Sequence, residues 1–131
     1  MKKNLLTTSI ILFFGCNKEP YQLPYLTSLG YVIEKEYCKN DDMKEYWLID
    51  VFSVQNGPEK IGDTVFVNGI YYNNVIKSTG LHDKIKIIGQ KVAIDFEIDN
   101  SIPQQTTGCL VSNPVTYKLK VAKIHASGEA R

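Results

Sequence analysis

The sequence predicts an all-β fold, either a small closed or partly open barrel, OB-like, or a sandwich of six to seven short strands. Two observations carry this prediction. Apolar and polar residues alternate in several short segments, which is the two-residue period of a β-strand. An Asn-Gly pair, Asn68-Gly69, joins two of these segments in the manner of a tight hairpin. No stretch of the sequence shows a sustained helical period.

The first two strands are expected at 31–38 and 46–54. Residues 31–38 mix polar and apolar side chains, so their inward face is ambiguous. Residues 46–54 are mostly apolar, which predicts a central strand that is buried on both faces for part of its length. The polar residues 39–42 between the two segments predict a turn.

Segments 64–67 and 70–73 flank the Asn-Gly pair and predict a β-hairpin. Asn and Gly tolerate positive φ, which a type I′ turn requires at both of its central positions. A two-residue loop also sets the register of the two strands. We therefore expect these pairs across the hairpin: Val67 with Ile70, Phe66 with Tyr71, and Val65 with Tyr72.

The C-terminal half predicts two further alternating strands. Residues 117–121 alternate, and Ile124 breaks their phase, which indicates a bulge or the end of the strand. Residues 91–99 alternate cleanly and predict a strand with one wet face and one buried face. The expected buried face consists of Val92, Ile94, Phe96 and Ile98.

Two connecting segments have less regular patterns. Residues 85–88 are short and apolar, and they predict one additional strand. Residues 101–114 contain two prolines and one glycine and predict a long loop, whose length is unusual enough to be functional.

The amino end resembles the signal peptide and lipobox of a bacterial lipoprotein. Met1-Lys2-Lys3 is basic, residues 5–14 are largely apolar, and Gly15-Cys16 follows. A membrane-spanning helix is the weaker interpretation, because Thr7, Thr8 and Ser9 interrupt a run that is already short of the roughly 20 apolar residues needed.

The resemblance implies that residues 1–15 are removed and that Cys16 becomes the first mature residue. Cys16 would then carry a diacylglycerol thioether and an N-acyl chain such as palmitate, which anchor the protein in a membrane almost irreversibly. Asn17 after the cysteine favours the outer membrane, at its periplasmic face or at the cell surface. Lys18-Glu19 partly resembles the surface-export signal of Bacteroidetes lipoproteins.

These features divide the chain into three parts. Residues 1–15 are the expected signal peptide, residues 16–29 the lipidated N-terminus and tether, and residues 30–131 a single β domain. Pro20 and Pro24 disfavour regular structure in the tether.

Charge and cysteine content limit the possible partners. Removal of Lys2 and Lys3 with the signal peptide lowers the formal net charge from +1 to −1, which gives no electrostatic reason to bind nucleic acid. Cys38 and Cys109 form an even pair in an exported chain and predict a disulfide. Its loop of about 70 residues is expected to stabilise the fold by roughly 4 kcal/mol. A reactive or metal-binding thiol pair is the alternative.

Three segments also resemble the OB-type domain of NigD-like lipoproteins from Bacteroidetes. They are Trp47-Leu48-Ile49-Asp50-Val51, Gly89-Gln90-Lys91-Val92-Ala93-Ile94-Asp95-Phe96 and Tyr117-Lys118-Leu119-Lys120, and the resemblance covers about half of the mature chain. It implies an OB-like fold and no defined activity.

The sequence contains none of the common catalytic motifs: no G-x-S-x-G, P-loop, G-x-G-x-x-G or H-E-x-x-H. His82 and His125 are expected to be separate surface residues. The acidic cluster of Asp41, Asp42 and Glu45 does not have EF-hand spacing and predicts a solvated turn. No cofactor and no metal site are expected.

Aromatic side chains are the remaining candidates for binding, because exposed tyrosine and tryptophan offer flat contact surfaces at low entropic cost. Trp47, Tyr71 and Tyr72 are the candidates, and core or edge packing is the alternative explanation for each. The predicted function is that of a non-enzymatic binding or accessory module for an envelope protein or a glycan. The first alternative is an inhibitor of a lysozyme- or protease-type enzyme, with loop 101–114 inserted in its active site. An enzyme or a purely structural lipoprotein is a further alternative.

Overall fold

The structure is a computed structural model that describes residues 24–36, 45–101, 105–107 and 117–131. It confirms the all-β class. The described elements are β1 (Leu26–Glu36), β2 (Tyr46–Gln55), β3 (Asp63–Val67), β4 (Ile70–Ser78), the 3-10 helix η1 (Asp83–Ile85), β5 (Lys91–Ile98), β6 (Gln105–Thr107), β7 (Tyr117–Leu119) and β8 (Ala122–Glu129).

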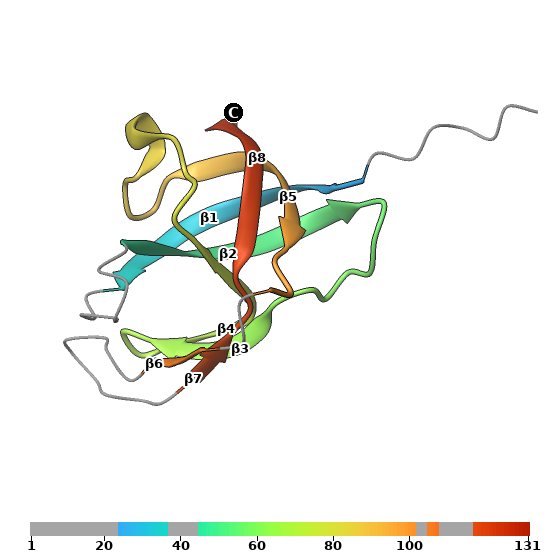
Figure 1. Ribbon diagram of the computed structural model, residues 1–131. Coiled ribbons are helices and arrows are strands. Elements are labelled where there is room, and N and C mark those ends of the chain that lie inside the picture. The colour runs from blue at the N-terminus through green and yellow to red at the C-terminus, as the bar shows by residue number, and fades with distance from the viewer. Residues whose placement is uncertain (1–23, 37–44, 102–104, 108–116) are drawn as a thin grey trace, which may run out of the picture.

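Six antiparallel strands form one sheet in the order β3-β4-β2-β1-β5-β8, and β6 pairs with β7 in a second, two-stranded sheet. The large sheet is strongly curled, so that the β3–β4 hairpin lies across from β1, β2 and β5, with β6 and β7 beside it (Figure 1). The sheet does not close, which fits a partly open barrel or a sandwich.

Two hydrogen bonds and a β-bridge connect the end of β4 with the chain that enters β8. The Lys77 N–H at the end of β4 donates to the Lys120 carbonyl at 3.1 Å, and the Ser78 hydroxyl donates to the Ala122 carbonyl at 2.7 Å. Lys77 and Val121 form a parallel bridge at this point. The chain entering β8 is thereby held against β4, although β8 lies at the far edge of the sheet order.

The predicted hairpin is confirmed in its register. Val67 pairs with Ile70, Phe66 with Tyr71 and Val65 with Tyr72. The two turn residues have the expected positive φ, 49° at Asn68 and 81° at Gly69.

Strand β5 also follows its pattern, since Val92, Ile94 and Phe96 are fully or almost fully buried, whereas Ile98 at its end is only partly buried. Its partner β8 pairs Ala126 with Asp95 and Ile124 with Phe96, so His125 is an extra residue between them. The expected strand 117–121 is divided, because β7 ends at Leu119 and β8 begins at Ala122 in the other sheet. The phase break expected before Ile124 therefore marks the end of a strand, and a separate β-bulge follows it at His125.

Three predictions about individual segments are corrected. Residues 85–88 do not form a strand: Ile85 ends the 3-10 helix η1, and residues 86–88 have no strand pairing. The Nδ1 of His82 caps η1 by accepting from the Lys84 N–H at 3.3 Å. Strand β1 begins at Leu26, inside the segment 16–29 that was expected to be tether. The expected loop 101–114 contains β6, because Gln105–Thr107 pairs with β7.

Apolar side chains form two clusters. Because β2 contributes Trp47 and Ile49 to the first and Leu48 to the second, its predicted burial on both faces is confirmed. Each fully buried aliphatic side chain contributes about 1.5–3 kcal/mol to stability. The first cluster contains Val32, Trp47, Ile49, Val51, Ile61, Ile76, Leu81, Ile85, Val92, Ile94, Phe96 and Ala122. The second contains Ile33, Leu48, Val65, Val67, Val75 and Leu119, with Tyr72 packed against it.

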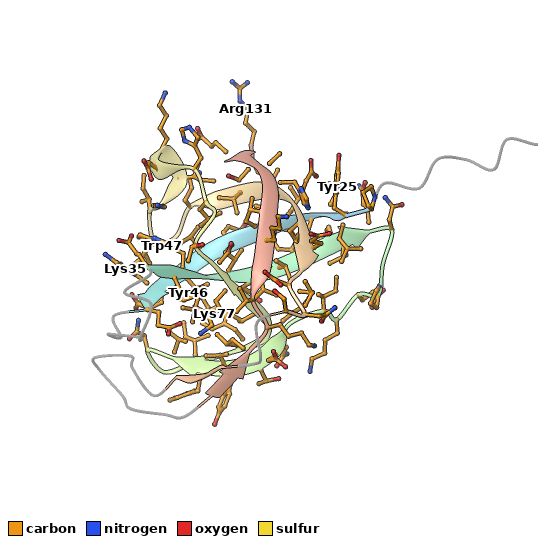
Figure 2. The ribbon with its side chains drawn as sticks, viewed as in Figure 1. Tyr25, Lys35, Tyr46, Trp47, Lys77 and Arg131 are labelled. Carbon is orange, nitrogen blue, oxygen red and sulfur yellow. The ribbon has the colours of Figure 1, made fainter. Side chains whose placement is uncertain are left out.

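An ion pair is buried beside the second cluster. The Lys77 Nζ of β4 lies 3.3 Å from the Glu36 Oε2 of β1, and the two side chains are 0% and 1% exposed. The Lys77 ammonium also lies 4.6 Å from the centre of the Tyr46 ring, and Figure 2 shows these two residues close together. Within the described residues, the other carboxylate oxygen of Glu36 has no hydrogen-bond partner. This pair links β1 and β4 across β2.

Candidate binding site

A pocket of about 270 Å³ opens where β1, β2, β4 and the loop before β5 meet. It contains two tyrosine side chains and one carboxylate among apolar and backbone groups. This feature is called the Asp50 pocket, and its lining residues are Tyr31, Val32, Ile33, Asp50, Tyr72, Ile88 and Gly89.

Strand register brings the polar and aromatic members together. Tyr31 of β1 is the direct partner of Asp50 in β2, so their side chains emerge side by side on one face of the sheet. A register shift in β1 between Val32 and Glu34 leaves Ile33 unpaired with β2, and Ile33 lines the floor of the pocket. The β3–β4 hairpin supplies Tyr72.

Backbone hydrogen bonds fix the loop that forms the remaining wall. The Gly89 N–H donates to the Val32 carbonyl at 2.7 Å, and the Val32 N–H donates to the Gln90 carbonyl at 3.0 Å. Gly89 has a φ of +88°, a conformation that favours glycine over every other residue. These contacts hold Ile88 against β1, where it is 53% exposed and forms an apolar rim with its neighbour Ile87.

Among the residues that the structure describes, Asp50 is the only carboxylate that lines the pocket. Burial raises its pKa above the ordinary value of 3.8, because the charged form loses part of its hydration. Within the described part of the chain, the Asp50 side chain makes no hydrogen bond or ion pair that would repay this loss.

Tyr31 forms an exposed wall of the pocket. The residue is 42% exposed, and its ring stacks on that of Phe52, with centroids 5.4 Å apart and planes at 23°. Lys91, the partner of Tyr31 in β5, places its Nζ 6.0 Å from the centre of the Phe52 ring and 3.5 Å from the Arg131 carbonyl oxygen. The cation of Lys91 is therefore engaged beside the aromatic pair, and it is not a cause of the shifted pKa of Asp50.

The three aromatic residues expected to bind a partner lie in three different environments. Tyr72 is half-buried and lines the Asp50 pocket. Tyr71 is 73% exposed near the tip of the hairpin, where its ring packs on Phe66 at 4.6 Å. Trp47 is 7% exposed within the first core cluster, and its Nε1 donates to the Glu45 carboxylate at 2.8 Å. This burial removes Trp47 from the candidate binding surface.

Neither Tyr31 nor Asp50 is among the residues that the sequence predicts to bind a partner. A signal for Asp50 exists nevertheless, because it is the single acid in the apolar segment 46–54. Burial of a charged side chain in such a segment costs folding free energy unless a partner or a ligand compensates its charge. No comparable signal exists for Tyr31, because only the register with β2 reveals its neighbour.

The other titratable candidates do not form a second site. His82 caps η1, whereas His125 stacks on Tyr25 at 5.1 Å and lies 3.6 Å from Glu97. The hydrogen bond from Trp47 and the contact with Lys35 lower the pKa of Glu45. Among the residues described, no group of three histidine, cysteine or acidic side chains could hold a metal ion.

The remaining predicted site residues lie outside the described residues. They are the expected lipidation site Cys16, the expected disulfide partners Cys38 and Cys109, and the acids Asp41 and Asp42. The signal peptide, the lipid anchor and the disulfide therefore stay predictions.

Comparisons of the chain with protein-family models, with curated proteins and with solved structures give no match. The resemblance to NigD-like lipoproteins also stays a prediction. In the described segments, no helix has the length and apolar character to cross a membrane.

Proposed function

We propose that this protein is a lipid-anchored lipoprotein of the outer membrane and acts as a non-enzymatic binding or accessory module for another envelope protein or a glycan. The Asp50 pocket is its binding site. The observation that carries this proposal is the Asp50 carboxylate, which lies half-buried in a pocket that Tyr31 and Tyr72 also line and has no side-chain partner among the described residues. The pattern from Met1 to Cys16 supports the anchor.

The chemistry of the pocket favours binding over catalysis. General acid–base catalysis commonly relies on two positioned groups that exchange protons with the substrate, whereas the lining offers one carboxylate and two phenols. Apolar walls with a few polar groups are typical of recognition sites. Strand pairing and the Gly89–Val32 hydrogen bond preorganise this wall, which lowers the entropic cost of binding.

A site-directed crosslink in intact cells tests this proposal. A photo-crosslinking amino acid in place of Ile88, on the pocket rim, is expected to trap a discrete adduct with an envelope component. The same amino acid in place of the exposed residue Lys60, outside the pocket lining, serves as the control. The Ile88 adduct is expected to fall at least about fivefold when Tyr31→Ala is added, since a half-exposed aromatic anchor of this kind is worth about 1 kcal/mol or more.

Identical crosslinking from positions 88 and 60, or an Ile88 adduct that persists in full after Tyr31→Ala, contradicts the proposed site. The assay does not depend on the chemical class of the ligand, so it tests the binding role alone.

An inhibitor of a lysozyme- or protease-type enzyme is the second candidate. The observation that favours it is the β3–β4 hairpin, in which Ile70 is 53% exposed and Tyr71 is 73% exposed near the tip. A tight hairpin with a large apolar tip has a shape suited to insertion into a cleft. The test measures the activity of lysozymes and proteases in the presence of the purified protein. We expect inhibition of one of these enzymes at micromolar concentration and loss of this inhibition with Tyr71→Ala. No inhibition of any of them rejects this candidate function.

A further inference from the structure

The charge of the Asp50 pocket constrains what can occupy it. The carboxylate is half-buried, burial is the cause of its raised pKa, and no cation among the described residues lowers that pKa. A neutral occupant would deepen this burial and leave the charge unmatched, at a cost in binding free energy. A cationic occupant would supply the missing counter-charge.

Neighbouring charges do not change this conclusion. On the hairpin side, Glu34 is a further negative charge, with Oε2 accepting from the Asn68 Nδ2 at 2.9 Å. On the β5 side, Lys91, the cation that pairs with Tyr31 across β1 and β5, contacts the Phe52 ring and the Arg131 carbonyl. The described residues therefore give the pocket a negative charge.

The shape and lining also separate a basic side chain from a sugar. A hexose presents several hydroxyl groups that each need a polar partner, but most of the lining consists of apolar side chains, ring faces and backbone. Lysine and arginine side chains have an apolar stem and a cationic head. The stem would lie against Ile33 and Ile88, and the head would reach Asp50 between the two tyrosine rings, where cation–π attraction adds to the ion pair.

We propose that the Asp50 pocket binds a lysine or arginine side chain presented by a partner protein. This inference rests on the proposed function and names the ligand class of the same site. Asp50 provides the charge, Tyr31 and Tyr72 provide ring faces, and Ile33 and Ile88 receive the aliphatic stem. Exposed Ile87 and Ile88 extend the contact to apolar residues that flank the basic residue in the partner.

The test uses the lipid-anchored protein solubilised in a non-ionic detergent. The probes are blocked alanine pentapeptides with one central residue: arginine, its neutral isostere citrulline, lysine, or the neutral norleucine. Titrations are followed through the methyl resonances of Ile88, so that binding is measured at the pocket itself. We expect the charged peptide of each pair to bind about tenfold or more tightly than its neutral counterpart, and high salt to reduce this preference.

Two variants and one control complete the design. Asp50→Asn keeps the side-chain size, and it is expected to remove the preference for charge and to leave both peptides of a pair with equal affinity. Tyr31→Ala is expected to weaken the charged peptides about threefold or more. Asp95→Asn alters a carboxylate on the same sheet face, bonded to the Thr27 hydroxyl at 2.8 Å and outside the pocket, and is expected to change nothing.

Equal affinity for charged and neutral peptides, a preference that survives Asp50→Asn, or no shift with peptides at millimolar concentration overturns the inference. Stronger binding of a neutral oligosaccharide, such as a chitin fragment, at the Ile88 methyl signals also overturns it but leaves the proposed binding role in place. Failure of the Ile88 crosslink in cells is the separate result that counts against the proposed function.

Discussion

Asp50 occupies a position that stability alone does not explain. It interrupts the apolar segment 46–54, lies half-buried in a pocket that Tyr31 and Tyr72 also line, and receives no hydrogen bond from the described residues. A polar group that loses water without a replacement partner costs free energy. Such groups are common in binding sites, where a polar side chain that bonds to the ligand lacks a partner in the free protein and lowers its stability.

Asp50→Asn is expected to increase the free energy of unfolding at neutral pH. The pKa of Asp50 is higher in the folded state than its ordinary value of 3.8, so the folded wild type binds more protons between these two values and loses stability as the pH rises through them. The gain should be a few tenths of a kcal/mol, because much of the side chain remains in water. Chemical denaturation at neutral pH and below pH 3.8 measures it.

The gain should be full above this pH window and absent below it, where the wild-type carboxyl is protonated in both states. Asp95→Asn is the control, and it should bring no gain at neutral pH because Thr27 already satisfies that carboxylate. A less stable Asp50→Asn protein at neutral pH is the contrary result.

The buried pair of Lys77 and Glu36 gives a second prediction at this scale. Lys77→Met leaves the Glu36 carboxylate buried without its counter-charge and should lower the free energy of unfolding by about 3–5 kcal/mol. Adding Glu36→Leu should recover most of this loss, because two apolar side chains then replace two desolvated charges. Urea denaturation of the wild type, both single variants and the double variant measures the coupling, and additive losses would refute it.

At the scale of elements, the β3–β4 turn depends on the backbone conformation of Gly69. A Cβ at this residue meets no atom within 4 Å, so a substitution acts only through its φ of +81°. Gly69→Ala should therefore cost about 1–2 kcal/mol. Gly128→Ala in β8 is a matched control, since its Cβ also meets no atom within 4 Å and its φ is not positive; it should be neutral or slightly stabilising. Thermal unfolding compares the two, and equal effects would contradict the argument.

The elements that were predictable are those whose signal is local. The Asn68-Gly69 pair determines the hairpin register through turn geometry, and the alternation of β5 determines its buried face. The segment 85–88 has the composition of a strand, but four residues are too few to show a period. Instead, Ile87 and Ile88 stay exposed, and the N–H of the following Gly89 donates to the Val32 carbonyl of β1.

The candidate site was predictable only in part, for the same reason. Tyr72 emerges from the hairpin pattern as one of two adjacent tyrosines that face opposite sides. The pairing of Tyr31 with Asp50 is different, because it depends on the register between β1 and β2 and on the position of the loop before β5. These are tertiary relations, and a mixed pattern such as that of 31–38 does not encode them.

At the scale of the whole molecule, the central prediction is the lipid anchor. Cys16→Ser should abolish incorporation of radiolabelled palmitate and release the protein from the membrane fraction, because the thioether cannot form. Cys38→Ser is the control and should retain the label, since Cys38 is predicted to pair with Cys109. Autoradiography of fractionated cells measures both. Palmitate that remains on the Cys16→Ser protein would refute the anchor.

The sheet order has a mechanical consequence. β1 is the first described strand, and it lies between β2 and β5, with hydrogen-bonded partners on both sides. Figure 1 shows β1 running beside β2 and β5. If Cys16 is anchored in a membrane as proposed, tension from that side would shear two ladders at once, whereas tension on the edge strand β8 would peel a single ladder. Since Tyr31 of the pocket belongs to β1 itself, a pull between the proposed anchor and a bound partner would pass through a strand that is paired on both sides.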